Sequence, residues 1–203
     1  MAGTQDTRLV GITGGIGAGK SVVSRILRLK GYQVYDCDSR AKELMSGSEE
    51  LIAALRERFG ESCVLEDGSL DSRLISAKVF SVEEERVWLN SLVHAAVRND
   101  LYTWRKSGKG ALCFVESAII ATSGLDRMCD SIWLVESPEQ LRIRRALGRG
   151  GINEKDLMQR IRAQQSEFGM LPPDKTKRIS NSGDSSLIEQ IDILLEVESK
   201  NIK

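Results

Sequence analysis

The stretch from Gly14 to Ser21 constrains this chain more than any other part of its sequence. It reads Gly-Gly-Ile-Gly-Ala-Gly-Lys-Ser and matches the pattern G-x-x-x-x-G-K-[ST] at every fixed position. Glycines let the backbone adopt positive φ, so successive N–H groups can point inward around a polyphosphate. Lys20 supplies a point charge for the β- and γ-phosphates, and the Ser21 hydroxyl can ligate Mg²⁺. The nucleotide-binding residues predicted here are Gly15, Ile16, Gly17, Ala18, Gly19, Lys20, Ser21 and Val22.

The residues on either side of this loop argue against the alternative of a glycine-rich turn with a stray lysine. A short β-branched run, Leu9 to Ile12, precedes the loop, and apolar residues at helical spacing follow it as far as Gly31. The next run, Tyr32 to Tyr35, reads as a second strand. Strand, loop, helix and strand form one βαβ unit, which favours a parallel sheet.

The remaining pattern predicts one domain with a helical insertion. Between residues 46 and 106 the pattern is mainly helical, and Ser46 and Glu49 are spaced as a capping box. Strands are expected at 111–115 and 131–135, with a weaker one around Ile179. Asn153 and Ser186 are expected to cap two later helices. We expect a single domain over 1–203, with a core of 8–45, 107–140 and 176–203, an insertion at 46–106 and a lid region at 141–170.

Composition narrows the class of protein. The 203 residues carry 29 basic and 29 acidic side chains, so net charge gives no reason to expect a nucleic acid or a membrane as partner. The four cysteines are far apart and the chain has a single histidine, which excludes zinc-site spacing. No apolar run approaches the roughly 20 residues that span a bilayer, and residues 1–8 lack an apolar signal core. A cytoplasmic protein with reduced thiols is expected.

Three further features favour a small-molecule kinase over a GTPase. The guanine-reading pattern Asn-Lys-x-Asp does not occur in the sequence. Glu116 follows a predicted strand, where an acid can hold the metal directly or through water. Six arginines lie between 142 and 162, a density that suits a lid closing over the phosphates of ATP.

Several stretches, in order along the chain, resemble the dephospho-coenzyme A kinase family from about Leu9 to Leu195. They are Gly11-Ile12-Thr13, Asp36-Cys37-Asp38, Asp67 to Asp71 through Val79-Phe80, Val93-His94 with Arg98, Ser137 to Arg149, Ala163-Gln164, and Asn181 with Gly183. The resemblance implies an α/β fold of the P-loop NTPase type, three-layered with a parallel sheet, a helical coenzyme A-binding insertion and a short lid. It also implies transfer of the ATP γ-phosphate to the ribose 3′-hydroxyl of dephospho-CoA, with Mg²⁺.

The resemblance also suggests roles for individual residues. Asp38 matches the family's proposed general base, although a strand-end turn residue is the alternative. Arg145 and Arg149 match lid arginines that bind ATP phosphates, where the alternative is a solvated helix face. Asn181 and Gly183 match a segment beside the adenine. The residues matched to substrate contact are Thr13, Asp38, His94, Arg98 and Glu116, although Thr13 can instead support the loop and a lone helical histidine is more often a packing residue.

The sequence departs from the family pattern at four places. His-Pro is replaced by His94-Ala95, and a stretch with acids at both ends reads Glu116 to Thr122, so its last acid is lost. Ser72 replaces an arginine, and Gly150-Gly151 follow Arg149 where acids are usual. These changes concern the residues expected to bind the phosphate acceptor, and they leave the phosphate-binding pattern intact. A nucleoside monophosphate kinase and a non-catalytic ATP-binding regulator therefore stay open as alternatives.

Overall fold

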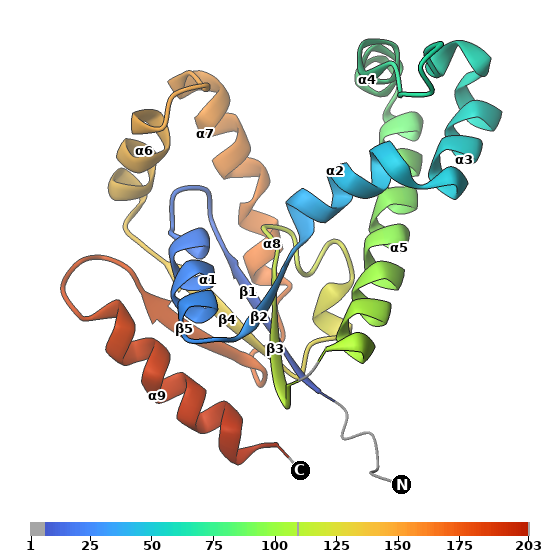
Figure 1. The fold of residues 1–203 in the computed structure, drawn as a ribbon. Coiled ribbons are helices and arrows are strands. Elements are labelled where there is room, and N and C mark those ends of the chain that lie inside the picture. The colour runs from blue at the N-terminus through green and yellow to red at the C-terminus, as the bar shows by residue number, and fades with distance from the viewer. Residues whose placement is uncertain (1–6, 109, 203) are drawn as a thin grey trace, which may run out of the picture. The chain divides into compact units, whose positions relative to one another are not determined.

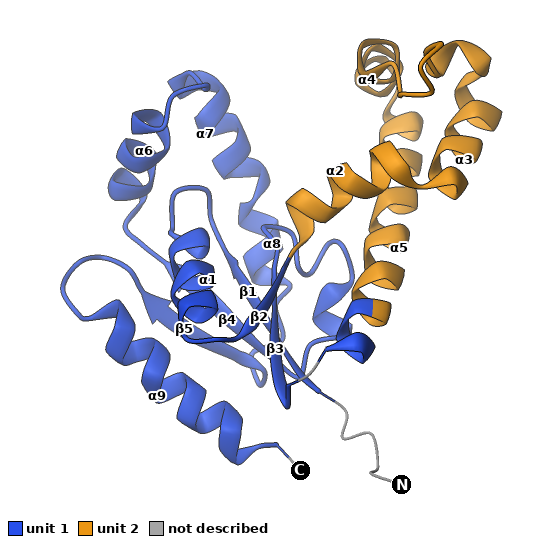
Figure 2. Ribbon diagram, viewed as in Figure 1, with its two compact units in different colours: residues 1–35, 104–203 blue, residues 36–103 orange. Residues whose placement is uncertain are grey.

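The computed structural model describes residues 7–108 and 110–202, which form two compact units. The first unit comprises the described residues up to Tyr35 together with those from Trp104 onward (Figure 2). The second unit comprises Asp36–Thr103. We expected the helical part to begin at residue 46. The second unit instead begins at Asp36, because a helix follows the second strand without an intervening loop.

The first unit is built on a five-stranded sheet (Figure 1). Its strands are β1 Arg8–Gly14, β2 Gln33–Asp36, β3 Leu112–Glu116, β4 Ser131–Glu136 and β5 Thr176–Ser180, in the order β2-β3-β1-β4-β5. β1 pairs in parallel with both β3 and β4, and β4 pairs in parallel with β5. The parallel sheet predicted from the βαβ pattern is confirmed, including the weak strand around Ile179.

Helices cover one face of this sheet through a continuous apolar core. Helix α1 spans Lys20–Leu29 and α9 spans Leu187–Lys200. The core contains Val10 and Ile12 of β1 and Trp133 of β4, each fully buried, together with Leu27 of α1 and Ile191 of α9. Strand residues alternate between faces. On the other face, a Cβ on Gly11 would meet the side chains of Ile120 and Cys129, so the segment after β3 covers that side.

Three short helices complete the first unit between β4 and β5. They are α6 Glu139–Gly148, α7 Glu154–Ala163 and α8 Gln165–Gly169. A 3₁₀ turn, η2 Leu125–Arg127, lies earlier, between β3 and β4. α7 begins where the sequence predicts, because the Asn153 side chain accepts a hydrogen bond from the Asp156 N–H at 2.9 Å. Ser186 caps α9 in the same way. Within the lid region, α6 and α7 share a small core of Ala146, Leu157 and Ile161.

The second unit is helical and has a core of its own. Its elements are α2 Cys37–Gly47, α3 Glu49–Phe59, the 3₁₀ turn η1 Glu61–Cys63, α4 Ser72–Ser81 and α5 Glu83–Ser107, the last of which continues into the first unit. Leu55, Phe59, Cys63 and Ile75 form this core, each at most 5% exposed. The apolar face that follows residue 50 therefore packs within the unit, as its helical spacing predicts.

One predicted cap in the second unit is wrong. Ser46 lies in the last turn of α2, where its hydroxyl donates to the Lys42 and Glu43 carbonyls, and Ser48 caps α3 by accepting from the Leu51 N–H. The Ser46–Glu49 spacing fits a capping box, but α2 extends to Gly47 and so includes Ser46. The start of α3 is therefore two residues later than the pattern indicates.

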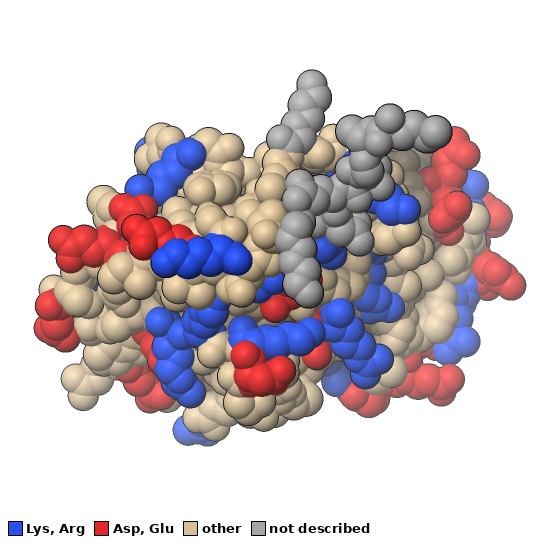
Figure 3. Space-filling view, turned by 90° about the horizontal axis from the view of Figure 1, so that it is seen from below, with Lys and Arg blue, Asp and Glu red and all other residues tan. Residues whose placement is uncertain are grey.

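On the face drawn in Figure 3, neither positive nor negative side chains dominate the surface. Basic and acidic side chains lie beside one another there, in keeping with the equal totals of the two charges. Within residues 7–108 and 110–202, every helix is too short or too polar to cross a bilayer.

Candidate active site

The glycine-rich loop joins β1 to α1, and two of its glycines are required by both conformation and space. Gly17 has φ +77° and Gly19 has φ +106°, in the left-handed region that side chains disfavour. A Cβ on Gly17 would lie 2.2 Å from the carbonyl oxygen of Arg142, and a Cβ on Gly19 would lie 2.2 Å from Nδ2 of Asn181. The loop therefore passes between the lid helix α6 and the segment after β5 as bare backbone.

The polar groups of the loop are partly committed to protein partners. The Lys20 ammonium donates to the Gly14 carbonyl at 2.8 Å, which folds its side chain back over the loop. The amide of Ile16 donates to Oε1 of Gln164 at 3.0 Å, and that of Ala18 donates to the Gly15 carbonyl at 3.0 Å. Two of the amides in the predicted phosphate cradle, those of Ile16 and Ala18, therefore have protein partners. The N-terminus of α1, which follows the loop, is a position that favours an anion.

Ser21 and Val22 lie in the first turn of α1, and both are exposed. A hydroxyl at this position is accessible to a metal ion carried by a nucleotide. Gly19 is the N-cap of α1, and no side chain caps the first turn of this helix.

A hydrogen-bonded network ties the loop to the segment after β5. The Asn181 side chain donates to the Ala18 carbonyl at 2.8 Å. The backbone carbonyl of Asn181 accepts hydrogen bonds from the Arg145 guanidinium at 3.1 Å and from the Ser137 hydroxyl at 2.9 Å. The structure thus brings together three regions that the sequence places far apart: the glycine-rich loop, the segment from Ser137 to Arg145 that includes most of α6, and the end of β5. Gly183 follows in the same segment, exposed and with φ +101°.

The lid region contacts the loop through apolar and charged groups. Ile16 packs against the core of α6 and α7, and the Arg142 guanidinium lies over Gly15, 1.9 Å from the place a Cβ there would take. Arg149 is exposed at the C-cap of α6. Gly150 and Gly151 follow with φ +72° and +77°, so the backbone beside Arg149 adopts a conformation that glycine favours.

Glu116 and Thr13 lie at the carboxyl ends of neighbouring strands. Glu116 ends β3 opposite Ile12 of β1, and the chain then turns so that the Ser117 amide donates to the Ile12 carbonyl at 3.0 Å. Glu116 is half-buried. Thr13 is fully buried, and its hydroxyl has no hydrogen-bond partner among the described residues. A buried Thr13 suits support of the loop better than contact with a ligand.

The other predicted substrate residues belong to the second unit. Asp38 is exposed in the first turn of α2, where the Asp36 side chain accepts from the amides of Asp38 and Ser39 at 3.1 Å each. Asp36 therefore has a capping role. His94 and Arg98 are half-buried and lie one turn apart on α5, on the same side of the helix.

Two residues near the loop had no role predicted from the sequence. Gln164 binds the Ile16 amide, and Glu167 binds the segment after β3 through Ala121 and Thr122. Gln164 occurs in a stretch that resembles the family, but nothing in its position signals its partner. Glu167 is 2% exposed at the end of a polar helical pattern, where a buried acid has no sequence signature.

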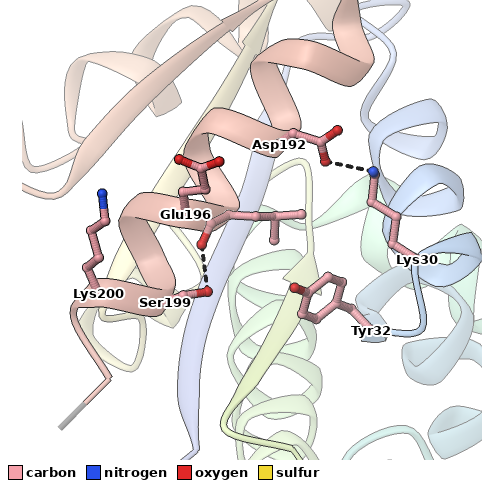
Figure 4. Close-up of a pocket in the computed structure, with 7 residues that line it drawn as sticks. Lys30, Tyr32, Asp192, Glu196, Ser199 and Lys200 are labelled. Atoms are coloured by element: carbon pink, nitrogen blue, oxygen red, sulfur yellow. Dashed lines mark hydrogen bonds and ion pairs between the residues drawn. The ribbon is translucent and has the colours of Figure 1, made fainter.

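Cavities do not by themselves locate the site. A cavity of about 230 Å³ borders Gly15 and is lined by Arg142, Glu136 and Phe168. A wider one of about 820 Å³ is lined by Lys30 and Asp192, which form an ion pair at 2.6 Å, and by Tyr32 (Figure 4). Lys30 follows the C-terminus of α1, whereas the glycine-rich loop precedes its N-terminus. The wider cavity is thus at the end of the helix remote from the predicted phosphate site.

The donors present fit a magnesium ion that arrives with a nucleotide. Among the described residues no three His, Cys, Asp or Glu side chains gather as a metal cluster. Mg²⁺ is usually held by few protein oxygens together with phosphates and water. The exposed hydroxyl of Ser21 and the carboxylate of Glu116 supply oxygens of that kind.

A parallel sheet whose first strand runs through a full phosphate-loop pattern into a helix defines a P-loop kinase when an arginine-bearing lid follows. Comparison with known proteins agrees. The model of the dephospho-CoA kinase family matches residues 8–181. A dephospho-CoA kinase from Porphyromonas gingivalis is 37% identical over 187 residues, 92% of each chain. This chain belongs to the dephospho-CoA kinase family.

Solved structures agree on the fold. The structure of TT1252 from Thermus thermophilus has a TM-score of 0.76 and 29% identity, covering 97% of this chain and 98% of that one. A dephospho-CoA kinase from Campylobacter jejuni has a TM-score of 0.63 at 20% identity, covering 95% and 98%. The second similarity shows the fold alone.

Proposed function

We propose that this protein transfers the γ-phosphate of ATP to the 3′-hydroxyl of dephospho-CoA, giving CoA and ADP. Membership of the family supports this acceptor. The observation that carries the proposal is the loop between β1 and α1, whose Gly17 and Gly19 admit no side chain and which precedes a helix N-terminus with Lys20 in its first turn. A bare backbone beside positive charge is the arrangement that a triphosphate requires.

In the proposed reaction the acceptor oxygen bonds to the γ-phosphorus as the bond from that phosphorus to the β–γ bridging oxygen breaks. The proton of the hydroxyl passes to the Asp38 carboxylate, and ADP leaves with the electron pair of the broken bond. Lys20, Arg145 and Arg149 stabilise the charge on the phosphate oxygens. Asp38 is exposed and ionisable, as a base must be.

Other residues hold the two substrates. The amides at the start of α1, with Val22 in its first turn, take the phosphates, and the segment of Asn181 and Gly183 lies beside the adenine. His94 and Arg98 grip the acceptor. Ser21 and Glu116 would hold Mg²⁺, which neutralises phosphate charge when bound.

A panel of acceptors tests the proposal. Purified protein with ATP and Mg²⁺ is offered dephospho-CoA, nucleoside monophosphates and no acceptor, and ADP release is measured for each. We expect ADP in proportion to dephospho-CoA and a product of CoA mass by mass spectrometry. ADP release with a nucleotide but not with dephospho-CoA would reassign the acceptor. ATP binding without any turnover would support a regulator instead.

A further inference from the structure

Two side chains at the junction of α7 and α8 each hold a different loop of the proposed site. Gln164 accepts a hydrogen bond from the Ile16 amide at 3.0 Å. Glu167, three residues later, accepts from the amides of Ala121 and Thr122 and from the Thr122 hydroxyl, the last two at 3.0 and 2.8 Å. Residues three apart in a helical segment project from nearly the same side. One short junction thus contacts both loops.

The contact made by Gln164 fixes a peptide that its own neighbours leave undetermined. Ile16 lies between Gly15 and Gly17, and glycine places few steric limits on the orientation of an adjoining peptide. The Ile16 side chain packs against the core of α6 and α7, and its amide is directed to Gln164. Contacts with the lid region therefore fix the orientation of the Ile16 peptide. The orientation of that peptide in turn affects the direction of the amides that follow it in the loop.

The contact made by Glu167 is stronger than a surface cap. Its carboxylate is only 2% exposed and both oxygens accept hydrogen bonds. Bonds to a charged acceptor are about twice as strong as neutral ones. The segment it holds begins directly after Glu116, the acid that ends β3, and returns to β1 through the Ser117 amide and the Ile12 carbonyl. Glu167 thus holds the chain that carries Glu116.

We propose that Gln164 and Glu167 are positioning residues for phosphoryl transfer. Gln164 sets the orientation of the Ile16 peptide and so the convergence of the phosphate-binding amides. Glu167 holds residues 117–122, and with them the carboxylate of Glu116, in register with the loop. Because both come from the junction behind the lid, movement of α6 and α7 is coupled to the two loops. This inference rests on the proposed kinase function.

The alternative is that both side chains merely anchor α8. An anchor affects stability, and its loss leaves the kinetics of the folded enzyme unchanged. A positioning residue changes kinetic parameters at temperatures where the variant is fully folded. An anchoring role therefore predicts a lower melting temperature with unchanged ATP affinity and kcat. A positioning role predicts a change in ATP affinity or kcat even well below the melting temperature.

Gln164→Met tests the first contact, because methionine keeps the length of the side chain and removes the acceptor. Gln159→Met on the exposed side of α7 is the matched control. We expect Gln164→Met to weaken ATP binding about fivefold to tenfold by calorimetry without acceptor, as loss of one hydrogen bond implies, while Gln159→Met stays within twofold. Equal ATP affinities in the two variants would overturn the role of Gln164.

Glu167→Gln and Thr122→Val test the second contact as a double-mutant cycle. Glu167→Gln keeps the shape but turns an amide NH₂ toward one set of donors. We expect kcat to fall about tenfold at saturating substrates with KM for ATP within twofold, and Thr122→Val to add little in the Glu167→Gln background. Unchanged kcat in both single variants, at temperatures below melting, would overturn the role of Glu167.

Thr122→Val keeps the test valid if Glu167→Gln does not fold. It removes one donor and alone should lower kcat about threefold, as loss of one of the three hydrogen bonds implies. Wild-type protein serves as the reference throughout. If it binds ATP but leaves dephospho-CoA unmodified, the proposed function fails, whereas the calorimetric comparison of Gln164→Met with Gln159→Met still decides the role of Gln164.

Discussion

The side-chain amide of Asn181 occupies the space that any side chain on Gly19 would need. A Cβ on Gly19 would lie 2.2 Å from Nδ2 of Asn181, and that same nitrogen donates to the Ala18 carbonyl at 2.8 Å. Two residues more than 160 positions apart thus fit against each other at the start of α1. The segment after β5 shapes the phosphate loop directly and does not merely border it.

Gly19→Ala should abolish ATP binding and lower stability. The new methyl group meets Asn181 and the residue must keep φ +106°, so both contact and backbone strain oppose it. Gly31→Ala is the control, because Gly31 has φ +90° but nothing within 4 Å of an added Cβ. Backbone strain alone costs about 1–2 kcal/mol. Chemical denaturation and ATP titration should show loss of both properties for Gly19→Ala and only a modest loss of stability for Gly31→Ala.

Asp38→Asn should remove turnover while leaving nucleotide binding intact. An amide cannot take the acceptor proton, so kcat should fall by about 10²–10⁴-fold. The dissociation constant for ATP should stay within twofold by calorimetry. Glu49→Gln, which removes an exposed acid from the first turn of α3, controls for the effect of a helix N-terminus. Comparable activity of Asp38→Asn and wild type would leave Asp38 as a turn residue.

Glu198 is a fully buried carboxylate on α9 that contacts residues of β1, β4 and β5. Burial raises its pKa, but hydrogen bonds from Lys177, Arg8, Ser131 and Trp133 outweigh burial and hold the pKa below its usual value. Arg8 lies 2.8 Å from one oxygen, and Trp133 Nε1 lies 3.2 Å from the other. A lowered pKa in the folded state favours folding above the unfolded value, about 4.3, and that contribution is lost as pH falls through the folded value.

Glu198→Gln should therefore destabilise the protein at pH 7 by about 2 kcal/mol, because the half-buried cations Arg8 and Lys177 lose their anionic partner. The difference from wild type should narrow as pH falls below about 4. Urea denaturation at several pH values measures it, with exposed Glu196→Gln as the control on the same helix. A difference that stays constant from pH 7 to pH 3.5 would show that the charge of Glu198 does not contribute.

Cys113 should resist alkylation in the folded protein. It is 2% exposed, and burial, with a smaller effect from Asp130, raises the pKa of its thiol to about 11 against a lowering effect of Arg105. At pH 8 only about one such thiol in a thousand is a thiolate, the reactive form. Iodoacetamide followed by peptide mass spectrometry should label Cys113 in denaturant but not in buffer. Equal labelling in both would contradict its burial.

The parts of the fold that the sequence predicts are those with local signals. The glycine-rich loop, the βαβ unit, and the caps Asn153 and Ser186 are all determined by residues within a few positions of one another. The sequence does not signal the start of α2, because Cys37–Gly47 is polar and has no apolar periodicity to distinguish it from a loop. Without that signal, the spacing of Ser46 and Glu49 predicts a helix start inside α2.

The parts of the site that could not be predicted depend on distant contacts. Gln164 reaches a loop 148 residues earlier, and Glu167 reaches one 45 residues earlier. Neither residue type nor spacing reveals such partners, since a polar side chain on a short helix is normally solvated. The carboxyl ends of parallel strands meet at one edge, so the approach of β1 and β3 was predictable. The hydrogen bonds by which Gln164 and Glu167 hold the loops after these strands are visible only in the structure.

Each unit also has a tryptophan inside an aromatic cluster of its own. The two units can therefore be distinguished by their tryptophan fluorescence. Trp133 contacts Phe114 edge-on at 5.2 Å in the sheet unit, and Trp88 contacts Phe59 edge-on at 5.5 Å in the helical unit. The third indole, Trp104, lies against Tyr35. Replacing Trp133 and Trp104 with phenylalanine leaves tryptophan fluorescence from the helical unit alone, whereas replacing Trp88 leaves it from the sheet unit alone. The melting of each unit can then be recorded separately within the intact chain.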